Sequence, residues 1–204
     1  MLVTAILPTR GRPQMAWDAL ECIERQTWSD LEIIILDDSE KPSFTSLSRK
    51  LTKSVRYQRS EEQCLGTKLN TACSLANGEY IIRFDDDDWS SPERTADQIN
   101  RLVESGKAVT SYRNMRFTDG ERTWINHNWP GGYGTSLAFR RQWWNEHPFQ
   151  PVTFGEDWEF VAESMRADQF VAGECDGFLV ASIHENHISP RIIGAGWEEI
   201  TGVR

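Results

Sequence analysis

The chain has 204 residues, which suffice for one substantial hydrophobic core but not for two comfortable domains, so we expect a single domain. Apolar residues make up 39% of the sequence and charged residues 26%, a balance that excludes a disordered chain. The formal net charge of -9 argues against a broad nucleic-acid footprint, because such a footprint needs clustered lysine and arginine, and it leaves room only for a local basic groove.

Nothing in the sequence predicts export or stable membrane insertion. No apolar run approaches the length of about 18 residues that a spanning helix needs, and the first eight residues lack the charged region and cleavage site of a signal peptide. Four cysteines show no C-x-x-C spacing, and two of them, Cys22 and Cys73, fall on apolar helix faces. Reduced thiols in a cytoplasmic protein are therefore expected.

The first 40 residues predict the beginning of a doubly wound sheet. Short apolar runs over residues 2–7 and 31–36 predict buried parallel strands, and apolar residues at helical spacing predict a helix over residues 14–26 between them. Strand, helix and strand together make a right-handed βαβ unit. No G-x-G-x-x-G follows the first strand, so a dinucleotide cofactor is not predicted.

The alternation of strands and helices continues to about residue 112, after a polar and irregular or weakly helical stretch over residues 40–53. The predicted elements are a strand over 55–58, a helix over 66–76 that Asn77-Gly78 ends, a strand over 79–84, a helix over 92–104 and a strand over 107–112.

The pattern loosens in the second half. Residues 115–118 and 122–125 predict a hairpin across Asp119-Gly120, a helix begins near Glu156-Asp157, and residues 177–183 predict a strand. This half also holds six tryptophans, which suit either the core or a stacking platform for a sugar ring or base. They are Trp124, Trp129, Trp143, Trp144, Trp158 and Trp197.

Four adjacent aspartates, Asp85 to Asp88, follow the predicted strand over residues 79–84. Adjacent carboxylates repel one another, so a cation or the N-terminus of the next helix has to take up their charge. Oxygen ligands favour Mg²⁺ or Mn²⁺, which commonly adds substrate phosphates to its shell. Ligands of open α/β sheets bind at the carboxyl ends of the strands, so the run predicts a metal and a nucleotide diphosphate. An acidic turn that caps the next helix is the alternative.

Other charged groups stand at the ends of predicted elements, and each has a structural alternative. Asp37 and Asp38 end the second strand, where a carboxylate caps a turn or accepts hydrogen bonds from a ribose or base. Lys68 lies in the first turn of a helix, where it is solvated or binds phosphate. The pair at residues 156 and 157 suits a helix dipole, and His184 with His187 suits either a structural role or metal binding.

The order and spacing of these pieces resemble the inverting family 2 glycosyltransferases, which have the GT-A fold. The resemblance runs from about Thr4 to Ser189 and covers most of the chain. The pieces that carry it are Leu7-Pro8-Thr9-Arg10-Gly11-Arg12-Pro13, Asp37-Asp38-Ser39, Gly66-Thr67-Lys68-Leu69-Asn70, Asn77-Gly78-Glu79-Tyr80-Ile81, Asp85-Asp86-Asp87-Asp88-Trp89, Gly155-Glu156-Asp157-Trp158 and His184 to Ser189.

The resemblance implies an α/β fold: a single GT-A-type domain with a Rossmann-like, mostly parallel central sheet flanked by helices, and a smaller mixed region on the acceptor side. Within this one domain of residues 1–204, about 1–112 would bind the nucleotide sugar. The remainder, about 113–204, would bind the acceptor and carry catalysis.

The resemblance also implies roles for residues on the donor side. They are Pro8, Thr9 and Arg10 in the nucleotide pocket, Asp37 or Asp38 on the base or ribose, Lys68 at the nucleotide or its diphosphate, Asp85 near the ribose or a metal water, Asp86 between the two members of the D-x-D pair, and Asp87 as the direct metal ligand. One departure concerns Leu69, where many relatives have arginine, so Arg83, Arg191 or another group is the candidate replacement.

On the other side of the site, the resemblance implies that Asp157 is the catalytic base, with Glu156 beside it. His184 would complete the metal shell, and His187 is the reserve. The acceptor contacts expected in this half are Trp129, Gly134, Thr135 and Trp158.

The implied activity is metal-dependent, inverting transfer of a sugar from a nucleotide-diphosphate sugar, with a UDP-sugar as the expected donor and Mn²⁺ or Mg²⁺ as the cofactor. The acceptor stays open between a glycan, a lipid-linked sugar, a small molecule and a modified nucleobase, and the sequence does not specify an oligomeric state. Two alternatives remain: a sugar-phosphate nucleotidyltransferase, and a non-catalytic nucleotide- or carbohydrate-binding module on the same fold.

Overall fold

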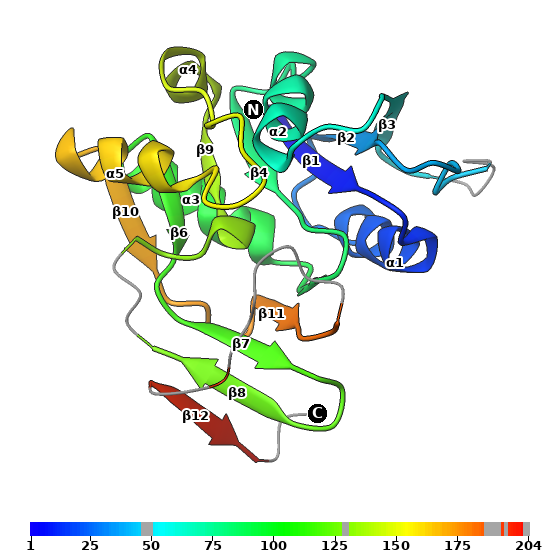
Figure 1. The fold of residues 1–204 in the computed structure, drawn as a ribbon. Helices are drawn as coiled ribbons and strands as arrows, with labels where there is room; N and C mark the ends of the chain where they lie inside the picture. Colours follow the sequence, from blue (N-terminus) through cyan, green and yellow to red (C-terminus); the bar gives the residue numbers. More distant parts are fainter. Residues whose placement is uncertain (46–50, 128–130, 186–192, 194–195, 202–204) are drawn as a thin grey trace.

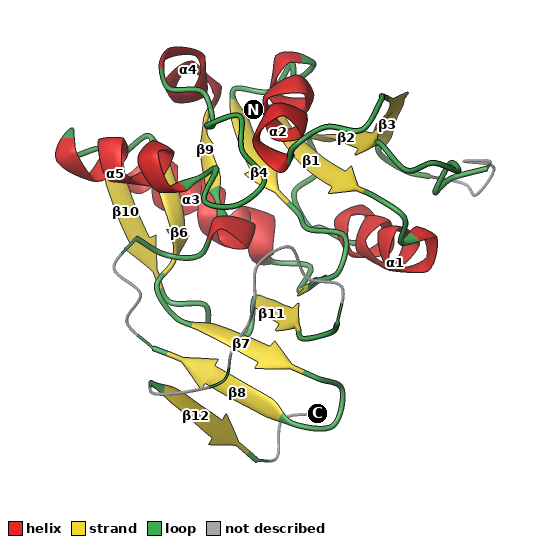
Figure 2. Cartoon of the chain, viewed as in Figure 1, coloured by secondary structure: helices red, strands yellow, loops and turns green. Residues whose placement is uncertain are grey.

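The structure is a computed structural model, and it describes residues 1–45, 51–127, 131–185, 193 and 196–201. A large sheet with helices on both faces lies above a smaller sheet (Figures 1 and 2). The helices are α1 (Pro13–Glu24), α2 (Leu65–Ser74), α3 (Arg94–Ser105), α4 (Arg141–Glu146) and α5 (Trp158–Arg166), with a 3-10 turn η1 (Gly134–Ser136). Within these ranges, no helix is both long and apolar enough to cross a membrane.

The large sheet has the strand order β10-β6-β9-β4-β1-β2-β3. Its strands are β1 (Val3–Thr9), β2 (Leu31–Asp37), β3 (Ser54–Arg59), β4 (Tyr80–Arg83), β6 (Val109–Tyr112), β9 (Ala138–Arg140) and β10 (Phe170–Gly173). Strand β1 pairs in parallel with β2 and β4, and β9 is antiparallel to both of its neighbours, β4 and β6. This arrangement is the mostly parallel α/β sheet that the sequence predicts.

Alternating residues of β1 pack into two separate cores, one on each face of the sheet. Val3, Ala5 and Leu7 face the side that α1 and α3 cover, whereas Ile6 faces the side that α2 and α5 cover. A strand that is buried on both faces needs apolar residues at every position, which explains the continuous apolar run. Because β1 pairs in parallel with β2 and β4, the carboxyl ends of these strands lie at the same edge of the sheet. The first turn of α2 lies near this edge, where Lys68 contacts Thr9.

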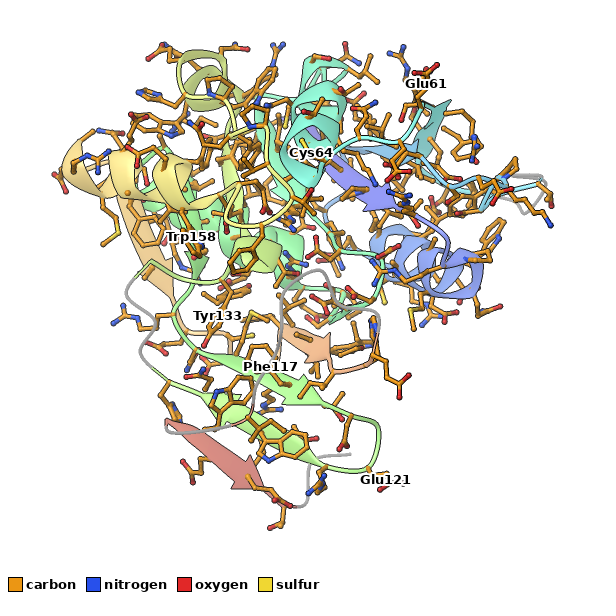
Figure 3. The ribbon with its side chains drawn as sticks, in the orientation of Figure 1. Glu61, Cys64, Phe117, Glu121, Tyr133 and Trp158 are labelled. Atoms are coloured by element: carbon orange, nitrogen blue, oxygen red, sulfur yellow. The ribbon has the colours of Figure 1, made fainter. Side chains whose placement is uncertain are left out.

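The smaller sheet has the order β12-β8-β7-β11-β5. Its strands are β5 (Trp89–Ser90), β7 (Met115–Thr118), β8 (Thr123–Asn126), β11 (Leu179–Ser182) and β12 (Trp197–Ile200). The predicted hairpin is present as the antiparallel pair β7 and β8. Phe117 of β7 and Tyr133 pack edge to face, with ring centroids 5.5 Å apart (Figure 3).

Several predicted boundaries and elements differ from the structure. Strands β5, β9, β10 and β12 and helix α4 are too short to give a periodic pattern, and the sequence interpretation missed them. Helix α2 ends at Ser74, and Asn77-Gly78 is not its C-terminal stop. Gly78 instead lies against β1, where an added Cβ would lie 2.7 Å from the Thr4 amide nitrogen. Helix α3 begins at Arg94, two residues after Pro92, which precedes the helix.

The burial of the cysteines and tryptophans tests two further predictions. All four cysteines are free thiols, and all but Cys64 are buried, as expected for reduced cysteines. Among the described tryptophans of the second half, Trp124 is buried, while Trp158 is 64% exposed. Trp143 and Trp144 pack on the core of the large sheet, and Trp197 packs on that of the small sheet. Most of these rings therefore belong to the core, as the structural alternative predicts.

Candidate functional site

A cavity of about 430 Å³ opens at the edge of the sheet where β1 and β4 end. Loops after these strands, the start of α2 and one residue before α5 line it, and Figure 3 marks Cys64 at the start of α2. The lining residues are Pro8, Thr9, Arg10, Arg12, Glu62, Gln63, Cys64, Leu65, Lys68, Arg83, Asp85, Asp86, Asp87 and Thr153. Most residues predicted for the nucleotide pocket therefore line one cavity.

Arg83, the last residue of β4, connects the aspartate run to the start of α5. Its guanidinium donates to both oxygens of Asp85, at 2.6 and 3.1 Å, and through Nη1 to Glu156 Oε1 at 2.9 Å. The Arg83 side chain is only 6% exposed, so the low-dielectric surroundings strengthen these charge-assisted bonds. The candidate replacement for the basic residue missing at Leu69 is thus inside the site, held by two carboxylates.

Arg12 connects the N-terminus of α1 to two other aspartates of the run. Its Nη2 donates to Asp86 Oδ1 at 2.5 Å, and its Nη1 donates to Asp87 Oδ2 at 2.8 Å. The Thr9 hydroxyl donates to Asp86 Oδ2 at 2.6 Å. Burial raises the pKa of Asp86 to about 7, although the charge of Arg12 and the Thr9 hydrogen bond act in the opposite direction. Asp86 therefore does more than fill a position, because it anchors the last residue of β1 and the N-cap of α1.

His184, just beyond β11, reaches Asp87 from the smaller sheet. Its Nε2 lies 3.0 Å from Asp87 Oδ2, and the tautomer of the ring sets which of the two atoms donates the hydrogen bond. The structure thus places the predicted histidine beside the predicted metal ligand. The reserve histidine, His187, lies outside the described residues, as does Arg191.

Asp88 connects η1 to β11 rather than only leading into the next helix. Its Oδ2 accepts a hydrogen bond from the Thr135 hydroxyl at 2.5 Å, and its Oδ1 accepts one from the Ser182 amide at 3.1 Å. One oxygen each from Asp85, Asp87 and Asp88 lie within 4.8 Å of one another. Such an oxygen-only group fits a hard divalent cation such as Mg²⁺ or Mn²⁺.

Lys68 and Asp38, both expected to face the nucleotide, form a buried ion pair with each other. Lys68 Nζ also donates to the Thr9 carbonyl at 3.4 Å, and the second oxygen of Asp38 accepts from the Gln63 amide at 3.0 Å. Asp38 thus fixes both the start of α2 and the loop before it. Lys68 lines the cavity, whereas Asp38 lies behind it.

Asp37 has a structural role in the fold. Its carboxylate accepts hydrogen bonds from the Ser39 and Ser43 amides and from the Tyr57 hydroxyl, at 2.7 to 2.9 Å, and pairs with Arg59 at 3.2 Å. Burial alone would raise the pKa of Asp37, but the hydrogen bonds outweigh it and hold the pKa at about 2. Asp37 is fully buried and does not line the cavity, so the Asp37 alternative for base or ribose binding is not favoured.

Glu156 and Asp157 precede α5 at the other end of the site. Asp157 lies so close to η1 that a Cβ on Gly134 would be 2.0 Å from its Oδ2, which explains glycine at this position. Burial raises the pKa of Asp157, and Arg83 offsets part of this rise; the same two causes act on Glu156. A carboxylate with a raised pKa is a stronger base than one in water.

The predicted acceptor residues divide into buried and exposed groups. Thr135 is buried through its bond to Asp88, and Gly134 adjoins Asp157. Trp158 is exposed beside Phe154, with ring centroids 5.2 Å apart, and Figure 3 places it at the start of α5. Trp129 lies outside the described residues.

Sequence reasoning missed several residues that line the cavity: Arg12, Glu62, Gln63, Cys64, Leu65 and Thr153. Only Arg12 gave a signal that could have been used. A positive charge at a helix N-terminus opposes the helix dipole, so an arginine directly before Pro13 calls for a reason other than helix stability. The others stand in loops or in the first residue of a helix, without a local pattern.

Comparisons with known proteins agree with this geometry. The family model described as "Glycosyl transferase family 2" matches residues 4–158. The putative colanic acid biosynthesis glycosyl transferase WcaA of Escherichia coli (strain K12) is 34% identical over 98 residues, which are 46% of this chain and 35% of WcaA. The chain thus spans about a third of that relative.

Solved structures resemble the chain over nearly its full length. S. aureus TarS 1-349 in complex with UDP-GlcNAc has a TM-score of 0.75 at 18% identity, over 95% of this chain and 62% of that one. The mannosyltransferase PcManGT from Pyrobaculum calidifontis, in complex with GDP-Man and Mn²⁺, has a TM-score of 0.70 at 18% identity, over 89% of this chain and 56% of that one.

At these identities the structural likeness establishes the fold, and it confirms the predicted GT-A-type arrangement. Membership follows from the family model, which covers more than half of the sequence. This chain belongs to glycosyl transferase family 2.

Proposed function

We propose that this chain carries the catalytic domain of a metal-dependent, inverting glycosyltransferase that moves a sugar from a nucleotide-diphosphate sugar to an acceptor hydroxyl. The observation that carries the proposal is the cavity, where the aspartate run meets Arg12, Lys68 and Arg83. This combination of acidic and basic groups suits a diphosphate together with a divalent cation. We assign residues of about 1–112 to the donor and those of about 113–204 to the acceptor and to catalysis.

The donor is proposed to be a UDP-sugar. TarS was solved with UDP-GlcNAc and PcManGT with GDP-Man, so both neighbours of the same fold take nucleotide-diphosphate sugars. Pro8, Thr9 and Arg10 would contact the nucleotide at the end of β1, and Lys68 its diphosphate at the first turn of α2. Backbone N–H groups of a helix N-terminus favour phosphate, which adds to the effect of the lysine.

Asp85 and Asp87, with His184 beside them, would hold Mn²⁺ or Mg²⁺, which when bound acts as a Lewis acid on the departing diphosphate. The residues of the chain supply the remaining requirements. Arg83 keeps Asp85 oriented by a two-pronged hydrogen bond. The Arg83 and Glu156 side chains are both buried, and their ion pair holds the start of α5 against the end of β4.

Asp157 is the proposed general base. Its raised pKa suits proton abstraction from the acceptor hydroxyl as this oxygen attacks the anomeric carbon and the bond to the diphosphate breaks. Attack from the face opposite the leaving group inverts the configuration. Gly134, Thr135 and Trp158 would border the acceptor, which is a glycan, a small molecule or a modified nucleobase.

Titration calorimetry with UDP and GDP, with and without MnCl₂, tests the donor site. Wild-type protein is expected to bind UDP in a Mn²⁺-dependent manner and to hydrolyse a UDP-sugar slowly in the absence of an acceptor. No binding of either nucleotide with Mn²⁺ would contradict the proposal. Release of pyrophosphate from a nucleoside triphosphate and a sugar 1-phosphate would instead identify a nucleotidyltransferase.

A further inference from the structure

The Arg12 side chain forms hydrogen bonds with carboxylates and none with the backbone of its own helix. It is the N-cap of α1, makes no side-chain capping bond there, and no acidic residue stands in the first turn. A positive charge at this end of a helix is electrostatically unfavourable. Its guanidinium nevertheless points to the aspartate run and is 20% exposed, so it lies in the cavity wall with one side accessible.

The two nitrogens of the guanidinium have different partners. Nη2 bonds Asp86, which the Thr9 hydroxyl holds from its other oxygen. Nη1 lies 2.8 Å from Asp87 Oδ2 and 3.5 Å from His184 Nε2, and these two atoms are 3.0 Å apart. Nη1 thus contacts both atoms that the proposed function assigns to a divalent cation. Two cations on one carboxylate oxygen repel strongly at such distances.

Acidic and basic side chains are equal in number among the described residues that line the cavity. Among the described lining residues, the acids are Glu62, Asp85, Asp86 and Asp87, and the bases are Arg10, Arg12, Lys68 and Arg83. A nucleotide-diphosphate sugar brings a doubly negative diphosphate and its metal brings a doubly positive ion, so the sum stays near zero. The positions of the charges change on binding. The metal adds positive charge beside the carboxylates, whereas the diphosphate needs positive side chains on its side of the cavity.

Of these four bases, Arg12 is best placed to move. Lys68 is buried against Asp38, and Arg83 is buried between Asp85 and Glu156. Arg10 pairs with Glu62 at an exposed position, away from the aspartates. Only the Arg12 contact combines partial exposure with a bond to the proposed metal ligand.

We infer that Arg12 is an exchangeable counter-ion of the site: a divalent cation displaces its Nη1 from Asp87, and the released donor binds the diphosphate of the nucleotide while Nη2 stays on Asp86. This inference rests on the proposed function, since it takes Asp87 as the metal ligand. It makes Arg12 a positioning and binding residue that links metal entry to nucleotide binding.

The test uses Arg12→Met in the full chain, with Arg25→Met as the matched control, because Arg25 is an exposed arginine at the other end of the same helix. Mn²⁺ binding without nucleotide is measured by electron paramagnetic resonance, and UDP binding at saturating Mn²⁺ by calorimetry. Arg12→Met is expected to lower the Kd for Mn²⁺ about tenfold and to raise the Kd for UDP about tenfold. Arg25→Met should change neither Kd.

The opposite signs of these two effects make the outcomes distinct. Weaker or unchanged Mn²⁺ binding by Arg12→Met would overturn the exchange and make Arg12 a support for the metal ligands. Unchanged UDP binding would overturn the contact with the diphosphate. If the wild-type protein binds neither Mn²⁺ nor UDP, the proposed function itself has failed.

A second measurement on wild-type protein covers the case in which Arg12→Met does not fold. The guanidinium resonance of Arg12 in ¹⁵N-labelled protein is identified by its loss in Arg12→Lys. Addition of Mg²⁺ alone is expected to shift this resonance, since the ion changes the partner of Nη1. An unshifted resonance at saturating Mg²⁺ would contradict the inference.

Discussion

On the side of β1 and α2, the described basic side chains that line the cavity each meet an acidic one, whereas two large aromatic rings are exposed just before α5 and at its first residue. The paired groups are Arg10 with Glu62, Arg12 with Asp86 and Asp87, Lys68 with Asp38, and Arg83 with Asp85 and Glu156. On the other side, Trp158 and Phe154 are 64% and 52% exposed. Ion pairs thus hold the basic groups of the proposed donor side in place, while the proposed acceptor side offers exposed aromatic surface.

Asp157→Asn removes the proposed base while leaving the donor side intact, and it should have the largest effect. Transfer or slow UDP-sugar hydrolysis is expected to fall about a thousandfold, with UDP binding within about twofold of wild type. Kinetics and calorimetry on the same preparation separate the two quantities. An equal loss of UDP binding would show that the two sides are not separate.

The pH dependence of turnover gives a further check on Asp157. A base must be deprotonated to act, and burial raises its pKa, so activity should fall on the acidic side at a pH above the ordinary aspartate value of about 4. The pH profile of kcat at saturating donor measures this limb. A limb at or below pH about 4 would contradict the buried environment of the carboxylate.

Arg83→Met removes the residue that joins the two sides, and its main effect should be on stability. Breaking a buried ion pair leaves Asp85 and Glu156 without their shared cation, which is expected to cost about 3 kcal/mol of unfolding free energy. Urea denaturation measures the loss. Adding Glu156→Gln to Arg83→Met should recover part of it, since one uncompensated charge is then gone; a purely additive double variant would refute the coupling.

Asp87→Asn tests the donor side alone. Loss of the proposed metal ligand is expected to weaken Mn²⁺-dependent UDP binding about a hundredfold. Calorimetry with and without Mn²⁺ measures the effect, and Asp18→Asn, an exposed aspartate on α1, is the matched control. Unchanged binding by Asp87→Asn would move the metal to other members of the run.

Asp37 should give the smallest effect, a difference in stability that shrinks as the pH falls. Its folded-state pKa of about 2 lies below its unfolded value of about 4, so its contribution to stability is present above pH about 4 and is lost as the pH falls through about 2. Urea midpoints between pH 5 and 2 for wild type and Asp37→Asn test this. The midpoint of the wild type should fall more steeply than that of the variant; parallel curves would contradict the assignment.

The alternating strands and helices of the first half were predictable because each carries a local pattern of apolar residues, and the predicted strand over residues 79–84 and helix over residues 66–76 bring Asp87 and Lys68 to the same cavity. The hydrogen bonds between residues that are far apart in the sequence were not predictable. Arg12 and Asp87 are 75 residues apart, and Asp88 and Ser182 are 94 apart, and no local pattern encodes such pairings. The position of β9 escaped prediction for a similar reason, since three residues carry no period and only its neighbours define it.

Strand β9 has a consequence for how the chain folds. It is paired on one side with β4 and on the other with β6, so β6 joins the strands β4, β1, β2 and β3 only after residues 138–140 have been synthesised and docked. Until then β4 has an open edge, and open edges invite pairing with other chains. A fragment that stops near residue 112 is therefore expected to aggregate rather than to fold as an autonomous unit, because residues 1–112 depend on the strand that follows them for their own assembly.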